Sequence, residues 1–98
     1  MTPRILISRE ARADIEEASC YLGAISPTLQ DRFKAELDRL YAVILEYPEM
    51  YPLVYRTSRR ALLRRFPYSV FYVIDESLVL VVGVVHQARD ESTWKRRA

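Results

Sequence analysis

The first part of the chain repeats hydrophobic residues at helical spacing. A short run, Ile5 to Ile7, is strand-like, and Ser8 follows it as a predicted N-cap, with Glu10 near the positive end of the helix dipole. The next hydrophobic positions are three or four residues apart and form one stripe: Ala11, Ile15, Ala18 and Leu22. The pattern therefore predicts a strand at 5–7 and a helix that ends near Gly23.

A second helix is predicted directly after the first. Ser26 and Pro27 are a typical helix start, because serine caps the first turn and the missing N–H of proline costs little there. The hydrophobic stripe of this helix is Leu29, Phe33, Leu37, Leu40 and Ile44. Pro48 closes it. Two helices joined by so short a turn are expected to form an antiparallel hairpin.

Past Pro52 the pattern changes to β-branched and aromatic residues with a period of two, which indicates a sheet. Strands are predicted near 61–66, 68–75 and 78–86, with a hairpin turn at 75–77. The last strand is hydrophobic on both faces, so it should lie inside a sheet that is covered on both sides. The helical hairpin can cover one side. The C-terminal segment, another subunit or a partner must cover the other.

This order of elements predicts an α+β fold in which an N-terminal strand and a helical hairpin pack on a small, mainly antiparallel sheet (β-α-α-β-β-β). The first strand can pair in either direction. At 98 residues, a single domain spanning residues 1–98 is expected. No hydrophobic stretch near the N-terminus is long enough for a signal peptide or a membrane span, which predicts a cytoplasmic protein. The one cysteine, Cys20, fits a reducing compartment and is expected to be buried.

Charge is unevenly distributed, although the net charge is only +2. Residues 1–50 hold six Lys/Arg against nine Asp/Glu, whereas residues 51–98 hold nine against four. Five arginines and no acid fall within one stretch of ten residues: Arg56, Arg59, Arg60, Arg64 and Arg65. The alternatives are a surface for nucleic acid phosphates or an acidic protein, and a solvated strand whose neighbouring arginines point to opposite faces. We favour an anionic partner, because so many like charges repel one another.

Two residues near the C-terminus are further candidates. His86, the only histidine, ends the last strand close to Arg89 and Asp90 and could act as acid or base near neutral pH. A structural role, with a hydrogen bond to backbone or to Asp90, is the favoured alternative. No metal site is predicted, because no second histidine or cysteine pair stands at ligand spacing. Trp94 could stack on a base or cover the bare face of the sheet, and we favour the cover.

The C-terminal half carries a more specific signal. Arg64-Arg65-Phe66-Pro67-Tyr68 precedes the long β-branched run, and His86-Gln87-Ala88-Arg89-Asp90 follows it. With the Ser8…Ala11…Asp14-Ile15 helix start and the Ile44…Pro48 helix exit, this order and spacing resembles the RelE/ParE toxin family of type II toxin–antitoxin systems. The resemblance implies the fold above and a hetero-oligomer with a cognate antitoxin, which wraps the toxin and neutralises it. An acidic, amphipathic antitoxin segment would meet the 56–65 surface and the groove along the two helices.

The resemblance implies two alternative activities. RelE-like members cleave messenger RNA on the ribosome, and ParE-like members poison DNA gyrase. In the RelE pattern a catalytic arginine follows the tyrosine that opens the central strand, but Ser69 follows Tyr68 here. Near the chain end, Trp94 stands where RelE carries a tyrosine, and an indole has no hydroxyl to act as a base. These departures favour a ParE-like toxin that acts by binding gyrase and is not an enzyme.

Each alternative makes its own prediction of site residues. A metal-independent endoribonuclease would use Arg65, His86 and Arg89 as catalytic residues. A surface for the target or the antitoxin would use Arg56, Arg59, Arg60, Arg64, Arg65, Arg89 and Trp94. No cofactor is expected in either case. A third alternative, from a different class, is a non-toxic family member that only binds its antitoxin.

Overall fold

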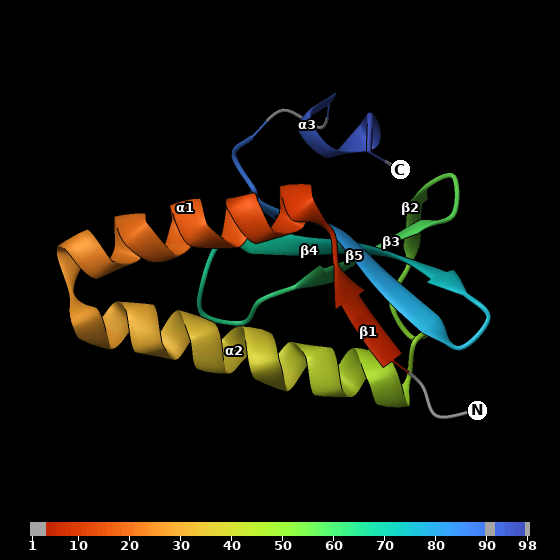
Figure 1. Cartoon of the computed structure of the whole chain (residues 1–98), viewed down its shortest axis with the longest axis horizontal. Helices are drawn as coiled ribbons and strands as arrows, with labels where there is room; N and C mark the ends of the chain where they lie inside the picture. The colour runs from red at the N-terminus through yellow and green to blue at the C-terminus, as the bar shows by residue number, and fades with distance from the viewer. Residues whose placement is uncertain (1–3, 90–91, 98) are drawn as a thin grey trace.

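A helical hairpin and a mixed sheet form the two main layers of the molecule (Figure 1). The computed structural model describes residues 4–89 and 92–97. In chain order the elements are β1 (Arg4–Ile7), α1 (Arg9–Ile25), α2 (Pro27–Glu46), β2 (Leu53–Tyr55), β3 (Ser58–Leu62), β4 (Tyr68–Asp75), β5 (Leu78–His86) and α3 (Ser92–Lys95). The predicted α+β fold is therefore confirmed.

The sheet has five strands in the order β1-β5-β4-β3-β2. β1 lies parallel to β5, and every other pair of neighbours is antiparallel. The sequence left the direction of the first strand open, and the structure shows that it runs parallel to β5, with two helices and three strands between them in the chain. β5 lies inside the sheet, as its hydrophobic run predicts. Within the described residues, no helix is long and hydrophobic enough to span a membrane.

Both helices begin at the serines that the sequence indicates. Ser8 Oγ accepts a hydrogen bond from the Ala11 N–H at 3.1 Å, and Ser26 Oγ accepts one from Thr28 at 3.2 Å. α1 ends at Ile25, close to Gly23, near which the sequence predicted its end. A Cβ at Gly23 would lie 2.7 Å from Gln30 Nε2. Gly23 therefore leaves room for the end of the Gln30 side chain, which donates a hydrogen bond to the Ser19 carbonyl at 2.9 Å.

One face of the sheet packs against the helical hairpin. The predicted stripes supply the helix side of this core, with Phe33, Leu37, Leu40 and Ile44 all buried. Phe33 contacts the ring of Tyr68 at 5.4 Å between centroids. Cys20 contradicts its prediction, because it is exposed on α1 between the two inward positions Ala18 and Leu22.

The other face is covered by the C-terminal helix α3. Trp94 is 4% exposed and stacks on Phe71 of β4, with 3.8 Å between ring centroids and 14° between planes. Tyr55 contacts the edge of the indole at 5.9 Å. These rings form a second, smaller core with Val82 and Val85. The favoured prediction for Trp94, that it covers the sheet, is confirmed.

The strand predicted at 61–66 is wrong in its bounds, and β2 was not predicted. β3 spans Ser58–Leu62 and pairs with β2 through a two-residue turn in which Arg56 has a φ of 51°. The turn contains no glycine or asparagine, so the usual signal for such a hairpin is missing. The turn predicted at 75–77 is confirmed, since β4 ends at Asp75 and β5 begins at Leu78.

Tyr72 links the sheet to the loop after α2. It is fully buried, and its hydroxyl donates a hydrogen bond to the Pro48 carbonyl at 2.6 Å. Burial raises the pKa of Tyr72 to about 12, although the nearby Arg59 partly lowers it. The neutral phenol is therefore the form that the fold holds.

We expect stability to fall steeply in alkali because of this group. An unfolded tyrosine ionises near pH 10, so between about pH 10 and 12 the unfolded chain loses this proton first, which lowers its free energy relative to the folded chain. Tyr72→Phe should flatten that fall and cost about 0.5–1.5 kcal/mol at neutral pH through the lost hydrogen bond. Urea unfolding at a series of pH values measures both effects. Tyr47→Phe, at an exposed site, is the control, and equal slopes in the two variants would contradict this role of Tyr72.

Candidate functional site

A groove lies between α1 and the C-terminal end of β5, with a volume of about 240 Å³. Its lining is Asp14, Glu17, Ala18, Tyr21, Tyr68, Val84, Val85, His86 and Arg89. Inside it the His86 ring meets the Tyr68 ring edge to face at 5.1 Å. Burial raises the pKa of Tyr68, and the neighbouring Tyr21 adds to the rise. The α1–β5 groove thus brings a histidine, a tyrosine and an arginine to one place.

A second hollow lies on the opposite face of the sheet, beside α3, with a volume of about 330 Å³. We call it the α3-face hollow. It is lined by Val54, Arg60, Leu62, Ser69, Phe71, Val85, His86, Gln87, Arg89 and Trp94. His86 and Arg89 border both the α1–β5 groove and this hollow, because they lie at and just beyond the end of β5. Three of the predicted binding residues, Arg60, Arg89 and Trp94, therefore meet in the α3-face hollow.

Arg59 and Arg60 point to opposite faces of the sheet, as their adjacency on a strand predicts. Arg59 Nη1 donates hydrogen bonds to the backbone carbonyls of Glu49, at 3.1 Å, and Tyr51, at 2.7 Å. These bonds hold the loop that follows α2. Arg60 instead lines the α3-face hollow and is exposed. Arg59 serves the fold, and Arg60 is available to a partner.

The other three arginines of the 56–65 cluster lie apart. Arg56 occupies the β2–β3 turn, with its guanidinium 5.2 Å from the centre of the Tyr55 ring. Arg64 is exposed in the loop before β4. Arg65 lines a separate hollow beside Arg32 and Arg39 of α2. The five arginines thus do not form one continuous surface.

The predicted nuclease residues are not brought together. Arg65 lies beside α2, whereas His86 and Arg89 border the α1–β5 groove and the α3-face hollow. His86 Nδ1 accepts a hydrogen bond from the Ala88 N–H at 3.0 Å, which is the backbone contact of the structural alternative. The other proposed partner of His86, Asp90, lies outside the described residues.

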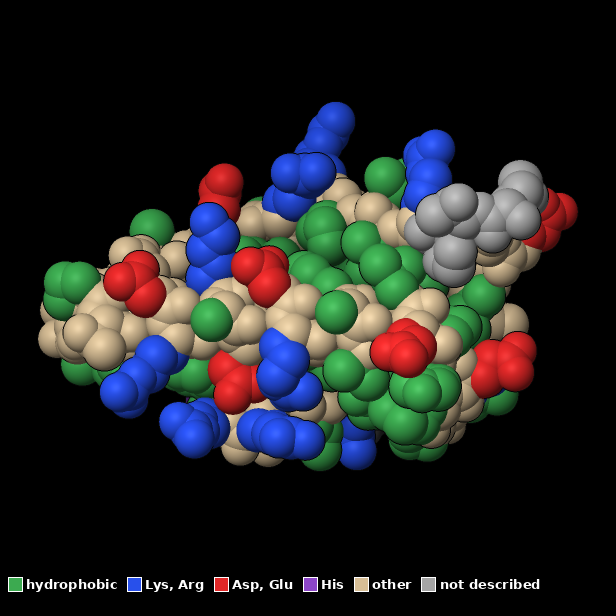
Figure 2. Space-filling model, turned by 90° about the horizontal axis from the view of Figure 1, so that it is seen from below, with side chains coloured by type: hydrophobic (Ala, Val, Ile, Leu, Met, Phe, Trp, Pro, Cys, Tyr) green, Lys and Arg blue, Asp and Glu red, His purple; other side chains and the backbone are tan. Residues whose placement is uncertain are grey.

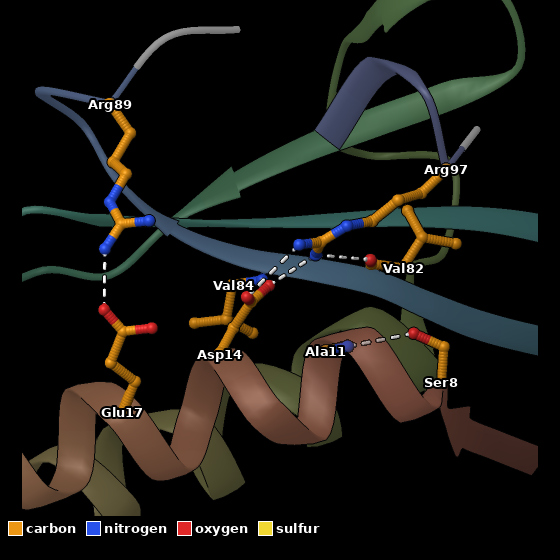
Figure 3. A network of polar contacts seen from close by, with 8 residues as sticks. All are labelled: Ser8, Ala11, Asp14, Glu17, Val82, Val84, Arg89 and Arg97. Carbon is orange, nitrogen blue, oxygen red and sulfur yellow. Dashed lines mark hydrogen bonds and ion pairs between the residues drawn. The ribbon is translucent and has the colours of Figure 1, made fainter. Parts of the chain in front are cut away.

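A partly buried ion pair was missed by sequence reasoning. Asp14 Oδ2 accepts hydrogen bonds from Arg97 Nη1 at 2.6 Å and from the Val84 N–H at 3.1 Å (Figure 3). Arg97 Nη1 also donates to the Val82 carbonyl at 3.3 Å. The signal in the sequence was a carboxylate at position 14, on the same side of α1 as the hydrophobic stripe between Ala11 and Ala18.

A second ion pair joins α1 to the segment after β5. Arg89 Nη2 contacts Glu17 Oε1 at 2.7 Å, and both side chains are more than half exposed (Figure 3). Exposed pairs of this kind contribute little to stability, since water and salt screen them. Within residues 4–89 and 92–97 no group of three His, Cys, Asp or Glu side chains is placed to hold a metal ion.

Comparison with known proteins places the chain in a family. The model of a family described as "ParE toxin of type II toxin-antitoxin system, parDE" matches residues 5–91. The chain belongs to the ParE toxin family. This membership confirms the resemblance to RelE/ParE toxins and its ParE-like form.

The fold of this ParE family member is also found in a solved structure. It is similar to a chain of the "Chromosomal ParDE TA system from P. aeruginosa", with a TM-score of 0.74. The match covers 87% of this chain and 96% of that chain at 15% sequence identity, so it shows the shared fold alone. No curated protein matches the sequence.

Proposed function

We propose that this ParE family member is a toxin that inhibits DNA gyrase by binding it and is neutralised by a cognate antitoxin. The observation that carries the proposal is the floor of the α3-face hollow. Ser69 lines this hollow, at the position where the RelE pattern has its catalytic arginine. Arg65 does not line it and lies in a separate hollow beside α2. The hollow has no cation at that one position to stabilise the phosphate during RNA cleavage, yet it offers a shaped surface for a protein.

A second groove supports the idea of a permanent partner. This groove, which we call the hairpin groove, has a volume of about 290 Å³ and lies between α1 and α2, beside β1. Its lining is Ile7, Arg12, Ile15, Glu16, Lys34, Leu37, Asp38 and Tyr41. Figure 2 shows hydrophobic surface of this kind between blue and red side chains on the α2 side of the molecule. An amphipathic helix of an antitoxin would bury this hairpin groove.

Tyr41 adds a polar feature to the hairpin groove. Its hydroxyl is buried and has no hydrogen-bond partner among the described residues. Burial raises the pKa of Tyr41 to about 12, so the hydroxyl keeps its proton. A partner that offers an acceptor there would satisfy a donor that the fold leaves unpaired.

Exposed hydrophobic side chains mark another contact surface. Tyr47, Met50 and Leu53 are each 56% exposed and follow one another from the end of α2 into β2. β2 is also an edge strand of the described sheet, where no other described strand pairs with the backbone groups on its outer side. We assign this end of the molecule to binding, and a large target such as gyrase would cover it.

Growth tests the proposal directly. Expression of this chain alone is expected to arrest growth, and the purified chain is expected to inhibit supercoiling by purified gyrase. The antitoxin from the adjacent reading frame should relieve both effects when it is co-expressed in cells or added to the purified chain. The physical reason is mass action, since a partner that occupies the hairpin groove removes the free toxin. If the chain binds that antitoxin but leaves growth, supercoiling and message integrity unchanged, it is the non-toxic binding module instead.

The ribosome-dependent endoribonuclease is the second candidate, because Tyr68, His86 and Arg89 share the α1–β5 groove. A general acid or base and a cation are the groups that such cleavage needs. Mapping of message 5′ ends in translating extracts separates the two functions. If new cuts appear in phase with codons and are absent in His86→Ala, the chain is an endoribonuclease, and gyrase inhibition is not its function.

A further inference from the structure

Three arginines surround a further hollow beside α2, which we call the arginine hollow. It has a volume of about 220 Å³ and is lined by Arg32, Ala35, Glu36, Arg39, Arg65 and Phe66. None of these residues lines the α1–β5 groove, the α3-face hollow or the hairpin groove. The arginine hollow is therefore a separate feature of the surface.

Helical spacing builds the α2 side of the arginine hollow. Arg32 and Arg39 are seven residues apart, which is close to two turns, so they lie on one face of α2. Ala35 lies between them on that face, and its small side chain leaves the space open. Lys34 and Asp38 line the hairpin groove instead. α2 thus presents one face to the hairpin groove and a different, arginine-bearing face to this hollow.

The loop between β3 and β4 holds Arg65 beside this face of α2. Phe66 is 8% exposed, and its ring meets Phe33 of α2 edge to face, with 5.5 Å between centroids. The Tyr68 N–H donates a hydrogen bond to the Phe66 carbonyl at 2.8 Å, and the Leu63 N–H donates one to the Tyr68 carbonyl at 3.1 Å. The backbone that carries Arg65 is therefore fixed before a ligand binds, which lowers the entropy lost on binding.

The arginine hollow carries a positive charge that its own residues do not neutralise. Its three arginines and one glutamate give a net charge of +2. Glu36 Oε2 accepts hydrogen bonds from Arg39 Nη2 at 3.1 Å and Nε at 3.4 Å, which orients that guanidinium. The guanidinium groups of Arg32 and Arg65 are exposed and make no hydrogen bond or ion pair with residues 4–89 and 92–97. Such groups are suited to donate to phosphate oxygens.

The lining favours the backbone of a duplex over other phosphate ligands. A single strand is bound largely by stacking of its bases on exposed aromatic faces, but Phe66 is buried against Phe33. Arg32 and Arg39 are about 10 Å apart along the helix axis. That length corresponds to about three successive phosphates of one strand of a duplex. A polyanion of this spacing also gains from the release of counterions at each phosphate, which a single small phosphate does not.

We infer that the arginine hollow binds the phosphate backbone of double-stranded DNA without reading its sequence. Arg32, Arg39 and Arg65 donate to phosphate oxygens, and the bases stay inside the duplex. The inference rests on the proposed function only for the source of the duplex, which is the DNA on which gyrase acts. A toxin that contacts this DNA as well as the enzyme is held at its target by two linked contacts, which strengthens binding without a new contact to gyrase.

The test is fluorescence anisotropy of a short labelled DNA duplex titrated with the purified full chain at a series of salt concentrations. The logarithm of the binding constant should fall with the logarithm of the salt concentration with a slope of about −2 to −3, because each neutralised phosphate contributes about −0.9. Arg65→Ala should weaken binding about threefold or more and make the slope shallower by about one. Arg64→Ala is the matched control, since it removes the same charge at the adjacent exposed position outside the lining and should leave the slope unchanged.

Results of three kinds would contradict this inference. Equal changes of slope in Arg64→Ala and Arg65→Ala would mean diffuse attraction without a site. Tighter binding of a single strand of the same length would mean contacts to bases. Equal displacement of the duplex by polyglutamate of the same net charge would mean a general surface for acidic molecules. Duplex binding is measured without gyrase, so failure of this inference and failure of the proposed gyrase inhibition are separate results.

Discussion

Trp94→Ala is expected to lower the free energy of unfolding by about 3–5 kcal/mol, the range for truncation of a buried aromatic side chain. The indole is the centre of the smaller core, where it stacks on Phe71 at 3.8 Å and meets Tyr55 at 5.9 Å. Its removal would leave a cavity over β4 and β5 and would expose Val82 and Val85 to water. Urea denaturation followed by circular dichroism measures the loss.

Trp94→Phe is the control for this prediction, since it keeps an aromatic ring in place. It should recover at least half of the lost stability, because most of the stacking on Phe71 remains. A loss below about 1 kcal/mol for Trp94→Ala would show that the sheet face tolerates exposure and that α3 is dispensable. The expected large loss would instead establish α3 as part of the fold.

Asp14→Ala is expected to cost about 2–4 kcal/mol, because it removes the acceptor of two partly buried donors at once. The Asp14 and Arg97 side chains are only 17% and 21% exposed, so water replaces the carboxylate poorly. The Val84 N–H loses its partner as well. Chemical denaturation of Asp14→Ala, of Arg97→Ala and of the double variant completes a double-mutant cycle, which isolates the energy of the pair.

Glu17→Ala is the matched control on the same helix. Glu17 lies one turn after Asp14 and also pairs with an arginine of the C-terminal segment, but that pair is exposed. Its loss should change stability by less than about 0.5 kcal/mol. Equal effects at the two positions would show that burial of the Asp14–Arg97 pair adds nothing.

Local patterns predicted most of the fold. Ser8 and Ser26 begin the helices because a serine side chain caps a helix through residues only two or three positions away. The stripe from Phe33 to Ile44 is buried because helical periodicity places it on one face. The β2–β3 hairpin was missed because the Arg56 turn carries no glycine or asparagine. Signals within a few residues of sequence therefore sufficed wherever the usual residue types were present.

The candidate site was predicted less completely. Arg60, Arg89 and Trp94 were named from the sequence and do meet, but Arg59 was named with them and binds backbone instead. Charge alone does not tell a guanidinium that faces a partner from one that holds a loop. That distinction depends on which carbonyl groups the fold places nearby.

The sequence by itself determined the helical hairpin, the β-rich C-terminal half and the ParE-like signature, because these follow from periodicity, capping and ordered motifs along the chain. Only the tertiary structure decided which arginines face one hollow and which acid anchors the C-terminal segment. Asp14 and Arg97 are 83 positions apart in sequence, and Asp14 and Val84 are 70 apart. No local pattern reports a contact of that span, since it exists only once the sheet and the helices have packed.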